Sequence, residues 1–141
     1  MEFRDTAADL AIAACLAVAV GSPLLKVTTL ILGDDIPFIL TTRHVRADLI
    51  DDLERKLLEC DSLTLVARSE GLGQLRRVSR TVGARLPTQQ EADLLECPSH
   101  APVLVVSTTS RIDNGSLLEC QEAVMNGQLV LVFRNDQPAV G

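Results

Sequence analysis

Turn signals between β-rich runs constrain the fold of this 141-residue chain more than any other feature. They are Asp34-Asp35, Asp113-Asn114-Gly115 and Asn126-Gly127. Asn-Gly pairs favour the tight turns of β-hairpins because Asn and Gly tolerate positive φ. The runs that these turns separate are 24–32, 38–45, 101–112, 116–125 and 128–134. The sequence therefore predicts strands that pair with their neighbours along the chain, in a mostly antiparallel sheet.

Helical spacing of apolar residues occurs in the segments between these runs. It is clearest at 48–60, where the opposite side of the helix carries acidic and basic residues. At 87–97, Thr88 as N-cap and Glu91 three residues later match a capping box. The predicted helices are 6–18, 48–60, 62–70 and 87–97, and the alternating segment 75–86 is predicted to be a strand.

The order of these elements indicates the fold class. Hairpins dominate, and the chain lacks the regular strand–helix–strand alternation of parallel sheets. We therefore expect an α+β fold, with a mostly antiparallel six-stranded sheet flanked by helices, and a single domain over 1–141. Six strands are more than one helical layer covers, so one face of the sheet should be open to a ligand or partner.

Composition excludes several classes of function. Aromatic residues make up 2% of the chain and the net charge is −6, so neither a base-stacking platform nor a basic surface for nucleic acid is expected. The longest apolar stretch, 10–20, is too short to span a bilayer, and it follows "MEFRD" rather than a basic signal region. We expect a cytoplasmic protein with no membrane partner and a core of Leu, Val, Ile and Ala.

The tetrapeptide "LLEC" occurs three times, yet its flanking residues and spacing differ, which argues against a structural repeat. It supplies three of the four cysteines, none of which forms a C-x-x-C pair. With only two histidines, the chain offers no paired ligands for structural zinc. We expect no metal, no cofactor and four reduced thiols that are buried as small hydrophobic groups.

The chain contains no sequence motif for catalysis: no G-x-S-x-G elbow, no P-loop and no G-x-G-x-x-G that opens a helix. The segment "LRRVSR" (75–80) instead places three arginines within one strand, with Arg76 and Arg80 predicted on one face and Arg77 and Ser79 on the other. These arginines either bind an anion or stay solvated and pair with acids. Glu119, in mid-strand, either faces solvent or accepts hydrogen bonds; the residues alone favour solvent.

Two stretches carry a resemblance to a known family. They are "GSPLLKVTTLILGDDIPFIL" and "RTVGARLPTQQEADLLECPSHAPVLVVSTTSRIDNGSLLEC". In order and spacing they resemble the UTRA domain, the effector-binding half of HutC-type GntR transcription regulators, from about Thr6 to Arg134. The stretch "LRRVSRTVGARLP" is most similar to regulators of phosphonate uptake and breakdown.

The resemblance implies a chorismate-lyase-like fold that holds a small-molecule effector against the sheet. It implies a homodimer without catalytic activity that controls a linked winged-helix domain. Residues 1–141 contain no winged-helix segment, so the chain is either one domain of a longer protein or a free-standing version. We expect DNA contact only indirectly, through such a linked domain.

The resemblance also implies which residues touch the effector. The family's charged positions on its first two strands read Thr29, Ile31 and Thr41 here, whereas Glu119 matches the family's strand glutamate. Arginines elsewhere would then supply the anion contacts. The candidate ligand-binding residues are Thr29, Thr41, Arg43, Arg76, Ser79, Arg80 and Glu119. Two alternatives remain: an enzyme of the chorismate lyase type on the same fold, and a dimerisation module whose pocket has decayed.

Overall fold

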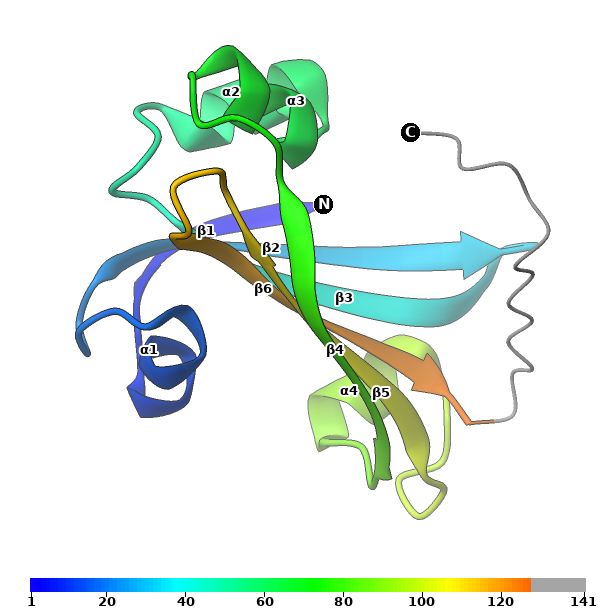
Figure 1. Ribbon diagram of the computed structural model, residues 1–141. Coiled ribbons are helices and arrows are strands. Elements are labelled where there is room, and N and C mark those ends of the chain that lie inside the picture. Colours follow the sequence, from blue (N-terminus) through cyan, green and yellow to red (C-terminus); the bar gives the residue numbers. More distant parts are fainter. Residues whose placement is uncertain (128–141) are drawn as a thin grey trace, which may run out of the picture.

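The computed structural model describes residues 1–127, which form one antiparallel sheet with helices on both faces (Figure 1). The strands are β1 (Glu2–Ala7), β2 (Pro23–Gly33), β3 (Ile36–Arg46), β4 (Arg76–Arg85), β5 (Val103–Arg111) and β6 (Leu117–Asn126). Their order in the sheet is β1-β2-β3-β6-β5-β4. The two hairpins β2–β3 and β5–β6 therefore meet in the middle of the sheet, where β3 pairs with β6.

The helices are α1 (Leu10–Leu16), α2 (Leu53–Cys60), α3 (Leu63–Ser69) and α4 (Gln89–Leu95). Figure 1 shows α2 and α3 on one side of the sheet, and α1 and α4 on the other, so the expectation that one face of the sheet is open is wrong. The capping box predicted for α4 is present: the Thr88 side chain accepts from the Glu91 amide, and the Glu91 carboxylate accepts from the Thr88 amide. No helix within residues 1–127 is long and apolar enough to cross a membrane.

Each helical layer has its own apolar cluster against the sheet. Under α2 and α3, Leu57 and Val66 pack with Val27, Val45 and Leu118 of the strands. On the opposite face, α1 packs over Leu24 and Cys120, and α4 packs over Leu40 and Val124. Because side chains alternate between the faces of a strand, each central strand contributes to the clusters on both sides.

The predicted fold class is confirmed, with two differences among the elements. The prediction of a helix from residue 6 is wrong: residues 2–7 form β1, and Asp9 caps α1 by accepting a hydrogen bond from the Ile12 amide over 2.9 Å. The helix predicted from residue 48 begins only at Leu53, because Asp52 has a left-handed backbone with φ of 58°. The predicted strand 128–134 lies outside the described residues.

Candidate ligand-binding pocket

A hollow of about 620 Å³ lies between the central strands and the start of α3. Its apolar lining comes from Ile31, Ile39, Leu63, Leu75, Val106, Ala123 and Met125. Its polar lining comes from Thr41, Arg43, Asp61, Ser62, Thr64, Arg77, Arg80, Thr108, Ser110, Glu119 and Gln121. Polar residues outnumber apolar ones in this lining, so the hollow is more polar than the usual small-molecule site, in which a few polar groups stand in a mostly apolar wall.

One ion pair holds the floor of this pocket together. Arg43 on β3 donates from Nε to Glu119 Oε1 over 3.2 Å and from Nη2 to Oε2 over 2.9 Å. The side chain of Glu119 is only 7% exposed and that of Arg43 is 24% exposed. Glu119 is thus buried, so the interpretation from the residues alone, that it faces solvent, is wrong. A two-point guanidinium–carboxylate pair of this kind fixes both side chains in orientation as well as in charge.

Arg77 and Arg80 reach the same pocket because β4 is irregular. The register with β5 pairs Arg77 with Ser110 and Arg80 with Thr108, and it shifts between Arg77 and Ser79. Residues three apart lie on opposite faces of a regular strand, but the extra residue of a bulge brings them to one face. The prediction that grouped Arg80 with Arg76 is therefore wrong, because it assumed unbroken alternation through Val78.

These two guanidinium groups differ from that of the other pocket arginine, because neither has a partner in the described part of the chain. Within residues 1–127, neither the Arg77 nor the Arg80 side chain has a hydrogen bond or an ion pair, whereas the Arg43 side chain is paired with Glu119. Both lie on an exposed strand at the edge of the sheet, next to the hydroxyls of Thr108 and Ser110. Asp61 also lines the hollow, and its carboxylate has no ion pair with any residue of 1–127.

The structure brings four of the seven predicted site residues together: Thr41, Arg43, Arg80 and Glu119 line the pocket. Three others do not line it. Thr29 pairs with Thr41 on the neighbouring strand but lies outside the lining. Arg76 donates to the Gln74 side chain over 3.2 Å, and Ser79 pairs with Thr109, which lines a different cavity.

Sequence reasoning missed Arg77, Thr108, Ser110 and Gln121, all of which line the pocket. One of these residues, Gln121, could have been predicted from the sequence. Once Glu119 is placed on the ligand face, strand periodicity places Gln121 on the same face. The contribution of β5 required its register with β6, in which Thr108 pairs with Gln121 and Ser110 with Glu119.

The chemistry of the pocket suits binding of an anion. Two guanidinium groups without a partner among the described residues and several hydroxyl groups are donors for phosphate, phosphonate or carboxylate oxygens. Within residues 1–127 there is no group of three or more His, Cys, Asp and Glu side chains that could hold a metal ion. The fold and this hollow together define a small α+β domain with a candidate ligand site on its sheet.

The chain belongs to the UTRA domain family, whose model matches residues 1–130. This places it among the effector domains of GntR-type transcription regulators. It is similar to the HTH-type transcriptional repressor NagR of Bacillus subtilis, with 25% identity over 116 residues. That match covers 82% of this chain but 47% of NagR, so the chain spans about half the length of this curated relative.

Solved structures agree with this assignment. The effector domain of PhnF from Mycobacterium smegmatis superposes with a TM-score of 0.76 at 26% identity, over 89% of this chain and 77% of that one. The C-terminal domain of YurK from Bacillus subtilis superposes with a TM-score of 0.81 at 17% identity, over 89% of this chain and 86% of that one. At that identity the likeness to YurK shows the fold alone.

Proposed function

We propose that this chain is the ligand-sensing domain of a transcription regulator, without catalytic activity, and that it binds a small organic anion in the pocket beside Arg77 and Arg80. The observation that carries the proposal is that both guanidinium groups line the pocket with no acid partner in residues 1–127. The chain has 19 acidic residues, so arginine side chains that line a pocket without an acidic partner are candidates for binding an anion. The family assignment supports a sensing role.

Phosphonates are the class of effector that we favour. The pocket lining combines guanidinium and hydroxyl donors with apolar side chains such as Ile39 and Met125. A phosphonate or phosphate ester with a short carbon chain matches both parts. The resemblance of "LRRVSRTVGARLP" to phosphonate regulators supports the same choice.

The proposed mechanism is a population shift in a cytoplasmic homodimer of the HutC type. The ligand would bind one arrangement of the two subunits more tightly, and linked winged-helix domains would follow. Self-association at the edge strand β4 is supported by its exposed apolar side chains. They are Val78 and Val82 in the strand and Leu86 directly after it. Contact with DNA would come only through the linked domain.

A thermal-shift screen tests the binding proposal. The wild-type chain is heated with phosphonates, phosphate esters, inorganic phosphate and small carboxylates. Each is added at increasing concentration, up to about a hundred times the dissociation constant of any ligand that binds. A ligand specific for the folded state should stabilise it by roughly 2.7 kcal/mol at that excess. No shift with any anion, in a chain that is dimeric by light scattering, would favour a dimerisation module with a decayed pocket.

An enzyme of the chorismate lyase type is the second candidate, because the resemblance implies the same fold for both. The described pocket contains no Cys or His side chain to act as nucleophile or base. Incubation of the chain with chorismate, followed by product analysis, separates the two functions. Turnover above the rate in buffer would overturn the assignment as a sensor without catalytic activity.

A further inference from the structure

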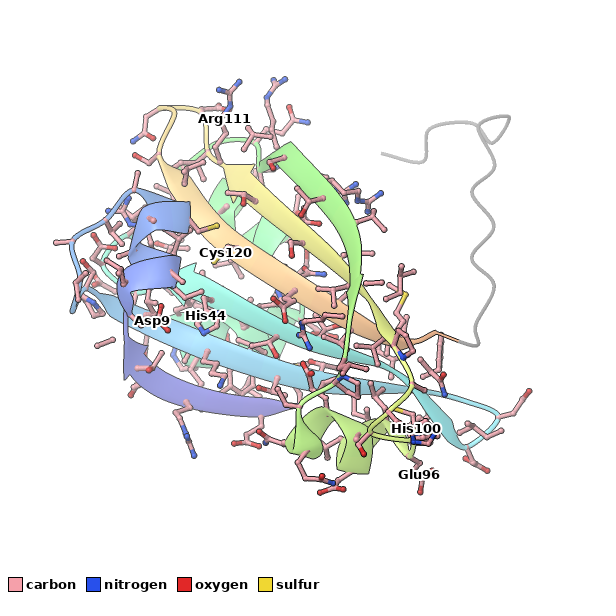
Figure 2. All side chains as sticks on the ribbon, turned by 90° about the horizontal axis from the view of Figure 1, so that it is seen from below. Asp9, His44, Glu96, His100, Arg111 and Cys120 are labelled. Carbon is pink, nitrogen blue, oxygen red and sulfur yellow. The ribbon has the colours of Figure 1, made fainter. Side chains whose placement is uncertain are left out.

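A second cavity, of about 200 Å³, lies on the opposite face of the sheet, between α1 and strands β3, β5 and β6. Two of the four cysteines line it: Cys15 from α1 and Cys120 from β6. Figure 2 shows Cys120 and His44 on the strands beside α1. The expectation of four buried thiols is wrong, since Cys15 and Cys60 are exposed and Cys97 is partly exposed, while Cys120 is buried.

The strand register places Cys15 against Cys120. Cys15 Sγ lies 3.4 Å from Thr109 Oγ1, and Thr109 is the direct cross-strand partner of Cys120. Such partners have Cβ atoms about 4.5–5.5 Å apart. Cys120 is flanked on its other side by His44, its partner on β3. The Cys15 thiol on α1 therefore lies against the strand residue that is paired with Cys120, whose thiol is buried.

The two thiols differ in accessibility to reagents. Burial, followed by the charge of the neighbouring Cys15, raises the pKa of the Cys120 thiol to about 12. Cys120 should therefore stay protonated and unreactive toward molecules in solution. Cys15 is exposed, so an electrophile reaches it first. An accessible thiol beside a sheltered one is the arrangement of an attacking and a resolving cysteine.

We propose that Cys15 and Cys120 form a reversible disulfide that ties α1 to β6. The Cys15 thiolate attacks one sulfur of a low-molecular-weight disulfide and releases one small thiolate, leaving a mixed disulfide on Cys15. Cys120, next to this mixed disulfide, loses its proton as its sulfur attacks the Cys15 sulfur, and the second small thiolate leaves and takes up that proton. Two protein thiols are oxidised to one disulfide, and one small disulfide is reduced to two thiols.

The position of this pair connects it to the ligand pocket. Glu119 lines the pocket on one face of β6, and the next residue, Cys120, lies on the other face. A disulfide at Cys120 would fix the strand that carries Glu119, and it would fix α1, which follows directly from β1 at the N-terminus. In a reducing compartment such a bond is transient and senses oxidants rather than building the fold.

The test is oxidation of the folded wild-type chain with glutathione disulfide, blocking of free thiols by alkylation, and peptide mapping by mass spectrometry without reductant. We expect a peptide pair joined through Cys15 and Cys120, more abundant than any other pairing by about tenfold, because the two thiols are pre-positioned. Reductant should restore both thiols. The same oxidation in denaturing urea should scatter the pairings among all four cysteines.

Variants separate the two steps. Cys120→Ser should accumulate glutathione on Cys15, and Cys15→Ser should give neither product at Cys120. A double variant, Cys60→Ser with Cys97→Ser, is the matched control and should still form the internal disulfide. The proposal is overturned if the native wild-type chain carries as much glutathione on Cys15 as the Cys120→Ser variant does. It is also overturned if the native chain pairs its cysteines as the chain in urea does. The wild-type map decides this even if a variant fails to fold.

Discussion

Arg43 and Glu119 form a two-point ion pair across the central strands, with Nη2 to Oε2 at 2.9 Å and Nε to Oε1 at 3.2 Å. The two residues are diagonal neighbours on one face, since Arg43 pairs with Gln121 and Glu119 pairs with Val45. The pair joins the β2–β3 hairpin to the β5–β6 hairpin at the pocket floor. It also keeps the Arg43 side chain paired, so that among the described residues Arg77 and Arg80 are the pocket arginines whose side chains have no partner.

Removal of Glu119 should destabilise the fold. In Glu119→Ala, Arg43 keeps its charge at a site where its side chain is only 24% exposed, and two charged hydrogen bonds are lost. We expect a loss of about 1–3 kcal/mol in the free energy of unfolding, measured by urea denaturation. Glu122→Gln is the control on the same strand: its side chain is 48% exposed, and its surface pair with Arg85 should contribute less than about 1 kcal/mol. Equal losses in both variants would contradict the conclusion that the buried Arg43–Glu119 pair stabilises the fold more than a surface pair does.

The arginines of β4 should differ in their effect on ligand binding. Arg77→Gln and Arg80→Gln each remove a charged donor from the pocket, so the dissociation constant of an anion found in the screen should rise about ten- to a hundredfold. Arg76→Gln, one residue away, changes an arginine outside the pocket and should leave the constant within about twofold. Titration calorimetry measures all three. Equal weakening by Arg76→Gln would indicate long-range attraction rather than contact.

Gly73 should tolerate substitution less well than Gly71. Both have positive φ, of 82° and 76°, so either change to Ala costs roughly 1–2 kcal/mol of backbone strain. A Cβ at Gly73 would in addition collide with the Asp113 side chain, which accepts a hydrogen bond from the Gln74 amide over 3.2 Å. We expect Gly73→Ala to lose about 1 kcal/mol more than Gly71→Ala in urea denaturation. Identical values would mean that Asp113 moves without cost.

Acid should weaken the chain partly through Glu91. A two-point pair with Arg85, then hydrogen bonds at the α4 N-terminus, hold the pKa of Glu91 below its ordinary value of 4.5 in the folded state. As the pH falls through 4.5, Glu91 is protonated in the unfolded chain before it is protonated in the folded one. The stabilisation that the pair gives above pH 4.5 is therefore lost as the pH falls from 4.5 to the lower pKa of the folded state.

The comparison of variants isolates this contribution. Glu91→Gln and Arg85→Gln should both show a flatter decline of unfolding free energy below pH 4.5 than the wild-type chain, because each removes the lowered pKa. The measurement is a series of urea denaturations at stepped pH. A wild-type slope in Glu91→Gln would mean that other carboxylates account for the whole acid effect.

Local sequence signals determined most of the elements of this protein. The turns at Asp34-Asp35 and Asp113-Asn114-Gly115 and the capping box at Thr88 gave hairpins and a helix start that the structure confirms. These signals work because φ preferences and caps involve residues a few positions apart. β1 was missed for the opposite reason, since the six residues of this edge strand are held by pairing with β2, about twenty positions away.

The ligand pocket shows the same division. Sequence alone supplied an arginine-rich strand, and the resemblance to the UTRA domain pointed to Glu119 on the ligand face. Tertiary structure decided which arginines share that face, because the irregular pairing of β4 with β5 at Val78 turns Arg77 and Arg80 to one side. It also placed Arg43 diagonally across from Glu119 through the register of β3 with β6. Register and bulges arise from contacts between distant strands, and local residue preferences do not encode them.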